Sequence, residues 1–167
     1  MEKISVPLNG APLMIGIVVA RFNEYAGKGL LENCVDELRA LGVEERSILV
    51  MEVPGALEIP MAMQMLANNY PVNAMIGLGA VIRGETYHFE VVSNESARGL
   101  MDVQLTYNIP VVNGILTTED DEQTKARLEV KGRDCARCAV EMGLYDLMLG
   151  MYDEDRLEDE DNEERKN

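Results

Sequence analysis

The residues best placed for proton chemistry lie in one short stretch, Gly79 to Phe89, which contains the only histidine of the chain, His88. An apolar run meets a Gly-Glu-Thr turn before an amphipathic stretch begins, which is typical of a buried strand, a turn and a helix. Ligands of parallel α/β proteins bind at such strand ends, and the N–H groups of a helix start suit an anion such as phosphate. We therefore expect an anion-binding turn beside an imidazole that can transfer protons near neutral pH.

Other strand ends carry residues with two interpretations each. Phe22 lies between Arg21 and Asn23, where a ring is more often part of a core but can also be exposed to a pocket. Glu58 could favour the dipole of a helix start, or its carboxylate could bind a polyhydroxylated substrate.

Three further residues follow the last apolar strand. Arg127 could be an ordinary surface residue, or its guanidinium could bind phosphate in a bidentate manner. Lys131 and Asp134 flank Gly132 and could form a solvated turn and a helix N-cap.

These residues must be positioned by alternating strands and helices. Apolar, β-branched segments predict strands over 14–20, 47–53, 74–81 and 111–116, and three- or four-residue periodicity predicts helices over 30–41, 59–69, 89–103 and 136–147. Strict alternation implies right-handed crossovers. The predicted fold is an α/β three-layer sandwich with a central, mostly parallel four-stranded sheet in a flavodoxin-like topology.

The chain divides by composition into three parts. At 167 residues it suits a single domain, which we place at residues 14–152. Residues 1–13 are polar and broken by two prolines, so we expect an amino-terminal arm or an edge strand on a neighbouring copy. Residues 153–167 hold nine acidic residues against three basic ones, which predicts a solvated, disordered tail.

Charge and hydropathy exclude two classes of partner. A net charge of −15 argues against nucleic acid, which binds clustered Lys and Arg. No apolar run is long enough to cross a bilayer, and the first residues do not resemble a signal peptide. We expect a soluble, cytoplasmic protein.

Three cysteines indicate free thiols in a reducing compartment. Cys135 and Cys138 match the C-x-x-C spacing of redox centres, but they lack a preceding strand. No second pair of ligands completes a zinc site, so we expect no metal.

Taken together, the motifs resemble those of one family, over about Ile15 to Met148. The matching stretches are Ala20–Asn23, Val53–Pro60, Gly79–Phe89, Gly114–Thr117, and Glu122-Gln123 followed by Arg127. They are similar to the 6,7-dimethyl-8-ribityllumazine synthase family of riboflavin biosynthesis. The resemblance implies condensation of 5-amino-6-(D-ribitylamino)uracil with 3,4-dihydroxy-2-butanone 4-phosphate, without metal or organic cofactor, releasing phosphate and water.

The resemblance also implies site roles. His88 is the catalytic proton shuttle, Phe22 stacks on the pyrimidine, and the phosphate is bound by the Glu85 backbone N–H, Thr86 and an Arg127 from the adjacent subunit. The ribityl-binding residues are Ala56, Leu57 and Glu58, the uracil-reading backbone belongs to Ala80, Val81 and Ile82, Lys131 lies near the pyrimidine, and Asp134 interacts with the histidine.

Some positions depart from the family pattern. Asn113 stands where many members carry an aromatic ring over the pyrimidine, which leaves Phe22 as the stacking platform. Asp134 replaces a commoner glutamate, and the segment between Arg127 and Lys131 is shorter than in many relatives. The resemblance further implies a homo-pentamer, in some members assembled into a sixty-subunit shell, with riboflavin synthase as a candidate partner.

Two other classes of function stay open on the sequence. The chain could bind a lumazine or flavin, or form a shell, without turnover; retention of Thr86, His88 and Arg127 favours catalysis. A flavodoxin-like electron carrier would carry a Ser/Thr-rich phosphate loop after its first strand, and residues 21–25 are not such a loop.

Overall fold

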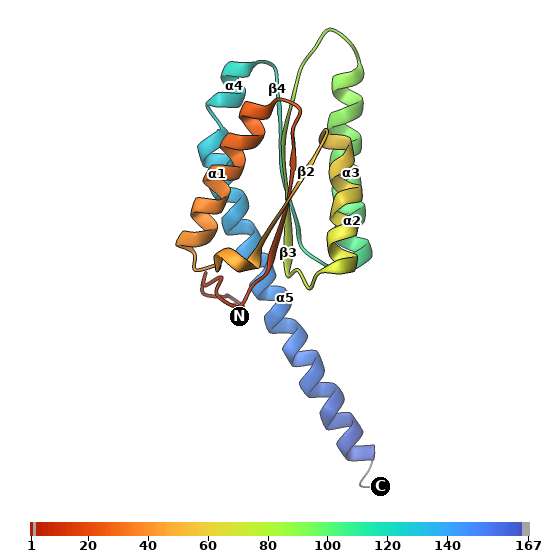
Figure 1. The fold of residues 1–167 in the computed structure, drawn as a ribbon. Coiled ribbons are helices and arrows are strands. Elements are labelled where there is room, and N and C mark those ends of the chain that lie inside the picture. The colour runs from red at the N-terminus through yellow and green to blue at the C-terminus, as the bar shows by residue number, and fades with distance from the viewer. Residues whose placement is uncertain (2, 165–167) are drawn as a thin grey trace.

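The computed structural model describes residue 1 and residues 3–164 (Figure 1). Strands and helices alternate along the chain, as the periodicity predicted. The elements are β1 (Ile15–Ala20), α1 (Glu24–Ala40), β2 (Ile48–Val53), α2 (Ile59–Asn69), β3 (Ala74–Ile82), α3 (His88–Tyr107), β4 (Val111–Thr118), α4 (Asp121–Lys125) and α5 (Leu128–Glu164), with short 3-10 turns at Glu45–Ser47 (η1) and Ala56–Glu58 (η2).

The four strands form one parallel sheet in the order β2-β1-β3-β4. In this register Ile15 lies beside both Ile48 and Ala74, and Ala80 lies beside Leu116. Helices α1, α4 and α5 cover one face of the sheet, and α2 and α3 cover the other (Figure 1). The predicted three-layer α/β sandwich is confirmed, and the described sheet is parallel throughout.

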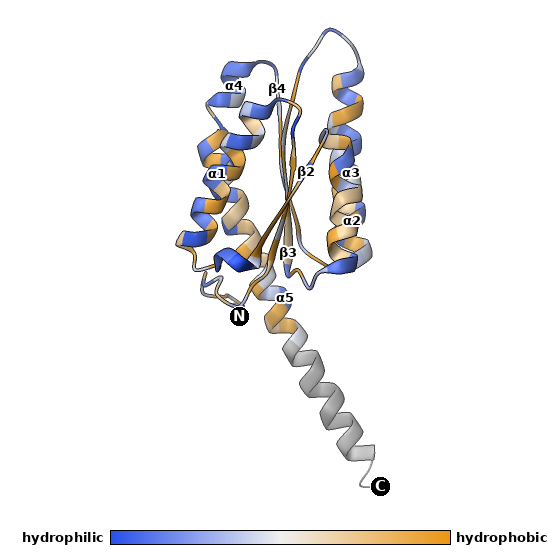
Figure 2. Cartoon of the chain, viewed as in Figure 1, coloured by the Kyte–Doolittle hydropathy of each residue, from blue (hydrophilic) through white to orange (hydrophobic). Residues whose placement is uncertain are grey.

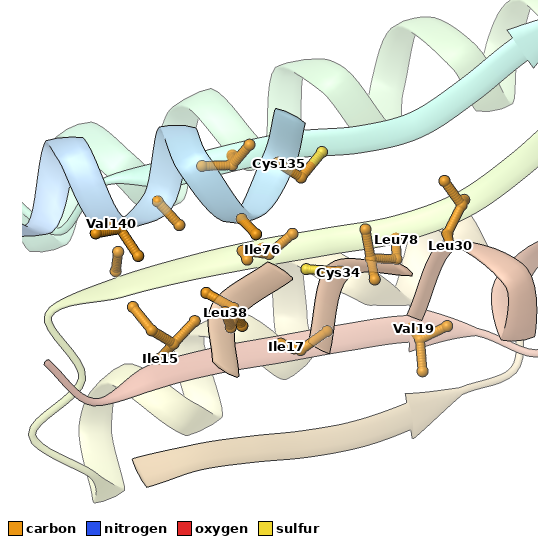
Figure 3. Packing of buried hydrophobic residues seen from close by; sticks show 14 of the residues in the cluster. Ile15, Ile17, Val19, Leu30, Cys34, Leu38, Ile76, Leu78, Cys135 and Val140 are labelled. Atoms are coloured by element: carbon orange, nitrogen blue, oxygen red, sulfur yellow. The ribbon is translucent and has the colours of Figure 1, made fainter. Parts of the chain in front are cut away.

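Each face of the sheet has its own apolar core. Ile15, Ile17 and Val19 of β1 face α1 and α5, where Cys34 and Cys135 also lie (Figure 3). The intervening side chains of β1 belong to the core under α2 and α3. Because β1 and β3 are covered on both faces, their sequences are continuously apolar, and Figure 2 shows hydrophobic residues along the strands between the two layers of helices.

Two helices begin earlier than predicted. α1 begins at Glu24 and not near Leu30, because its first turn packs through small residues, Ala26 and Gly27, which give no apolar periodicity. A Cβ atom at Gly27 would lie 2.6 Å from the carbonyl oxygen of Ala20, so this close approach to β1 requires glycine. α5 begins at Leu128, eight residues before the predicted 136, and α4 was not predicted.

A charged cluster joins α1 to α5. Glu37 is only 7% exposed, and its carboxylate accepts hydrogen bonds from Arg137 Nε at 2.7 Å and Arg133 Nη1 at 3.0 Å. These bonds, that from Arg137 first, hold the pKa of Glu37 below its usual range. Removing either partner would leave a largely buried charge less compensated, and the two bonds join α5 to α1.

The predicted boundaries at both chain ends stay predictions. Residues of the arm contact their own chain: the Gly10 N–H donates to the Leu41 carbonyl at 2.7 Å, and Leu13 is buried. α5 continues to Glu164, and residues 165–167 of the predicted tail lie outside the described residues. Within the described part of the chain, no helix combines the length and apolar character needed to cross a membrane.

Candidate active site

A cavity of about 470 Å³ opens at the carboxyl ends of β1 and β3, beside the start of α3. Its walls come from three separate stretches of the chain, which meet because parallel strands end at the same edge of the sheet. The lining residues are Ala20, Phe22, Asn23, Pro54, Gly55, Ala56, Leu57, Glu58, Ala80, Val81, Ile82, Gly84, Thr86, His88, Phe89 and Val92.

The turn after β1 presents an aromatic ring at the mouth of the cavity. Phe22 is 73% exposed, and its backbone N–H donates to the Pro54 carbonyl at 3.0 Å. Asn23 adopts a left-handed conformation with φ of 59°, which asparagine tolerates better than most residues. Its Nδ2 donates to the Ala80 carbonyl at 3.0 Å, so the end of β1 is tied to the end of β3.

The η2 turn supplies the second wall. Ala56 is buried, whereas Leu57 and Glu58 are exposed. The Glu58 N–H donates to the Gly55 carbonyl at 3.3 Å, and α2 starts directly afterwards with Pro60 in its first turn. A solvent-facing carboxylate in a cavity wall can accept hydrogen bonds from ligand hydroxyl groups.

The third wall combines the end of β3 with the turn that follows it. Ala80, Val81 and Ile82 pair with the last residues of β4, so the backbone that leads to the cavity is held by the sheet. Thr86 lies in the turn, and His88 is the first residue of the twenty-residue helix α3. The exposed imidazole and the positive end of the helix dipole therefore lie at the same place.

Five predicted site residues do not line this cavity. Glu85 is exposed in the turn between Gly84 and Thr86, and Asn113 is exposed on the edge strand β4, where its Oδ1 accepts the Ile115 N–H at 3.0 Å. Of the other three, Arg127 lies between α4 and α5, and Lys131 and Asp134 lie in the first turns of α5. Both helices cover the face of the sheet that α2 and α3 do not cover (Figure 1).

Arg127 is held in place by hydrogen bonds at the end of α4. Its Nη1 donates to the Gln123 carbonyl at 2.8 Å. The Gln123 N–H in turn donates to Asp120 Oδ1 at 2.7 Å, which caps α4, and the Gln123 side-chain oxygen accepts the N–H of Glu119, the residue before the cap, at 3.1 Å. The Arg127 side chain is exposed to solvent, and its hydrogen bond to Gln123 holds it at the end of α4.

Sequence reasoning assigned some cavity residues elsewhere or gave them no role. Phe89 and Val92 fall within the helix predicted over 89–103 and were given no site role, and the structure places them in the cavity wall. The four-residue spacing of His88 and Val92, and the three-residue spacing of Phe89 and Val92, are the signal that brings Val92 beside both side chains on the helix. Asn23 was recognised within a motif, and its hydrogen bond to Ala80 gives it a structural role.

The described residues contain no cluster of three or more His, Cys, Asp or Glu side chains arranged to hold a metal ion. The cysteines are free, and burial raises the pKa of Cys135 to about 11. A thiol with that pKa is protonated near neutral pH and is a poor nucleophile.

The fold and the cavity define a class: a parallel α/β protein whose strand-end cavity brings together an exposed aromatic ring, the N-terminus of a helix and one imidazole. A family profile described as 6,7-dimethyl-8-ribityllumazine synthase matches residues 12–145. The chain belongs to the 6,7-dimethyl-8-ribityllumazine synthase family.

Curated relatives with that same name cover most of the chain. The protein of Methylobacillus flagellatus is 58% identical over 142 residues, which is 85% of this chain and 95% of the relative. The proteins of Cupriavidus necator and Laribacter hongkongensis are 55% and 56% identical and cover 92% and 87% of this chain, each over at least 93% of its own length.

Proposed function

We propose that the chain is a transferase that condenses 5-amino-6-(D-ribitylamino)uracil with 3,4-dihydroxy-2-butanone 4-phosphate. The products are 6,7-dimethyl-8-ribityllumazine, phosphate and water, and the step is the penultimate one of riboflavin biosynthesis. Family membership supports the reaction. The observation that carries the site is that Phe22, Thr86 and His88, from separate turns, line one cavity.

The walls of the cavity suit the two substrates in different places. The Phe22 ring stacks on the pyrimidine, and the backbone groups of residues 80–82 read its edge. The ribityl chain lies along residues 56–58, where the Glu58 carboxylate accepts its hydroxyl groups. Thr86 and the free N–H groups at the start of α3 bind the phosphate, because that end of the helix favours an anion.

The chemistry requires proton transfers that an imidazole can perform. Amine attack on the ketone gives a carbinolamine and then an imine; phosphate elimination, ring closure by the second amine and a final dehydration follow. His88 accepts and returns protons in these steps, since histidine titrates near neutral pH. Holding both reactants in one cavity supplies much of the remaining acceleration.

A second copy of the chain completes the site in this proposal. Arg127 lies on the face of the sheet away from the cavity, and it reaches a phosphate only in a neighbouring subunit. In this proposal Lys131, Asp134 and Asn113 of the neighbouring subunit also contribute to the site. Exposed apolar side chains on the opposite helical layer support burial against further copies; they are Met61, Met65, Met101 and Leu105. We propose a homo-pentamer. A native-mass measurement would distinguish the pentamer from a sixty-subunit shell and from a complex with riboflavin synthase.

The direct test of the reaction is incubation of the purified protein with both substrates while lumazine absorbance and fluorescence are followed. Turnover well above the spontaneous reaction is expected. Binding of lumazine with no such turnover would select a binding or shell protein that has kept the fold.

The shared site has its own test, in which two variants with impaired turnover, His88→Ala and Arg127→Ala, are unfolded and reassembled together and assayed at a concentration of the phosphorylated substrate that does not saturate Arg127→Ala. If each site takes His88 from one chain and Arg127 from its neighbour, about a quarter of the sites in a random equal mixture regain both groups. Recovered activity is therefore expected. No recovery, alongside an active wild-type control treated in the same way, would place both groups in one chain's site.

A further inference from the structure

Arg83 lies directly between β3 and the turn that carries Thr86 and His88. Its backbone N–H donates to the Thr118 carbonyl at 2.9 Å, which extends the β3–β4 pairing to this residue. Its backbone position is therefore set by the sheet.

The Arg83 guanidinium contacts three side chains. Its Nη1 donates to Glu90 Oε1 at 2.5 Å, its Nε donates to Glu119 Oε2 at 2.6 Å, and it lies 4.1 Å from the centre of the Phe89 ring. Phe89 and Glu90 directly follow His88 in the first turn of α3, and Glu119 directly follows β4. One side chain thus joins the start of α3 to the ends of two strands.

The start of α3 depends on this contact more than a capped helix would. Its N-cap residue, Tyr87, makes no side-chain capping hydrogen bond in the described structure. Glu90 is the acidic residue of the first turn, and the Arg83 guanidinium holds the pKa of this carboxyl below its usual range. The resulting charge-assisted bond is stronger than a neutral one and ties the first turn to the sheet.

Arg83 is also the cation nearest in sequence to the anion-binding turn, so direct binding of phosphate is the competing interpretation. Two observations oppose it. Arg83 does not line the cavity, although Ile82, Gly84, His88 and Phe89 all do. Two carboxylates already occupy its Nε and Nη1 groups, and their two negative charges exceed its single positive charge.

We propose that Arg83 is a positioning residue, which holds the first turn of α3 against the ends of β3 and β4 and so presents His88 to the cavity. The consequence for turnover rests on the catalytic role proposed for His88. The consequence for the position of the imidazole does not.

The kinetic test is Arg83→Gln, with Arg98→Gln as the matched control. Arg98 lies on α3 and also bridges two carboxylates, Glu95 and Asp102, at 2.7 Å, but it is more exposed than Arg83 and lies away from the turn. A displaced catalytic group costs on the order of 10- to 100-fold in rate. We expect that loss in kcat for Arg83→Gln, little change in the KM of the phosphorylated substrate, and wild-type kinetics for Arg98→Gln.

The second readout needs no substrate. His88 is the only histidine, so a chain freed of any histidine tag gives a single imidazole signal in NMR spectra. Arg83→Gln is expected to shift that signal and Arg98→Gln to leave it unchanged. Arg83→Lys keeps the charge without the planar fork, and we expect an intermediate shift. A thermal melt shows whether Arg83→Gln folds. If it does not fold, the same measurements on Arg83→Lys test the proposal.

Two results would overturn the proposal. One is an imidazole signal and a kcat that Arg83→Gln and Arg83→Lys leave unchanged. The other is a loss that falls on the KM of the phosphorylated substrate alone, which would make Arg83 a phosphate ligand. Absence of turnover in the wild-type protein would contradict the proposed function, whereas the imidazole signal would still decide the positioning role.

Discussion

Replacing Phe22 by alanine should weaken binding of the pyrimidine substrate without weakening the fold. The ring is 73% exposed in the free chain, so its removal takes away little buried surface. Substitutions at such sites usually change the free energy of unfolding by less than about 0.5 kcal/mol. Stacking of a planar base on an aromatic side chain is worth about 1–3 kcal/mol. The expected result is a 5- to 150-fold rise in the dissociation constant, at about 1.4 kcal/mol per tenfold.

Tyr87 is the matched control for that experiment. Its side chain is also 73% exposed, it lies only one residue from His88, and it does not line the cavity. Calorimetric or fluorescence titration with the ribitylaminouracil should therefore give near wild-type affinity for Tyr87→Ala. Equal losses in the two variants, or no loss in Phe22→Ala, would refute the assignment of Phe22 as the stacking platform. A matching fall in melting temperature would instead make the ring a structural residue.

Three other predictions concern the imidazole, the guanidinium and the thiols. His88→Ala should lower kcat by roughly tenfold to a thousandfold with an unchanged melt, since proximity alone still accelerates the reaction; unchanged turnover would remove the proton-transfer role. Arg127→Ala should raise the KM of the phosphorylated substrate by about tenfold or more, as loss of a charge-assisted hydrogen bond implies; an unaltered KM would place the phosphate clamp elsewhere. Burial raises the pKa of Cys135 to about 11, whereas a thiol in the unfolded chain has a pKa of about 8.5. At a pH between these two pKa values, the unfolded chain therefore binds fewer protons than the folded chain. The free energy of unfolding from urea titrations should therefore fall as the pH rises from about 9 to 11, with a smaller fall in Cys135→Ala; equal slopes would exclude this thiol as a source.

The parallel sheet could be predicted from sequence because a strand that is buried on both faces appears as a continuous apolar segment. β1 and β3 are continuously apolar, and the predicted strand boundaries agree with the observed ones to within two residues. The first turn of α1 gives no apolar pattern, because Gly27 packs against the Ala20 carbonyl by lacking a side chain. α4 has only five residues and is held by polar hydrogen bonds, so apolar periodicity could not reveal it.

The candidate site was predictable to the extent that it follows the strand ends. Phe22, residues 56–58 and 80–82, Thr86 and His88 share the cavity, because each lies at the end of a strand or within a few residues after it, and these strands end at the same edge. Arg127 follows such a strand too, but α4 carries the chain to the other face of the sheet. The link from Arg83 to Glu90 and Glu119 depends on side-chain geometry between three elements, which spacing along the chain does not encode.

The two apolar cores differ in when they can form during synthesis. Every buried residue of the core under α2 and α3 lies between Val18 and Ile115. The core on the other face also needs Cys135, Ala136, Ala139 and Val140 of α5. Since a chain leaves the ribosome from its amino terminus, the cavity side can consolidate while α1 still lacks its partner helix. Until α5 emerges, the nascent chain exposes one apolar face of its sheet, and this interval is when chaperone binding or premature association with another chain would act.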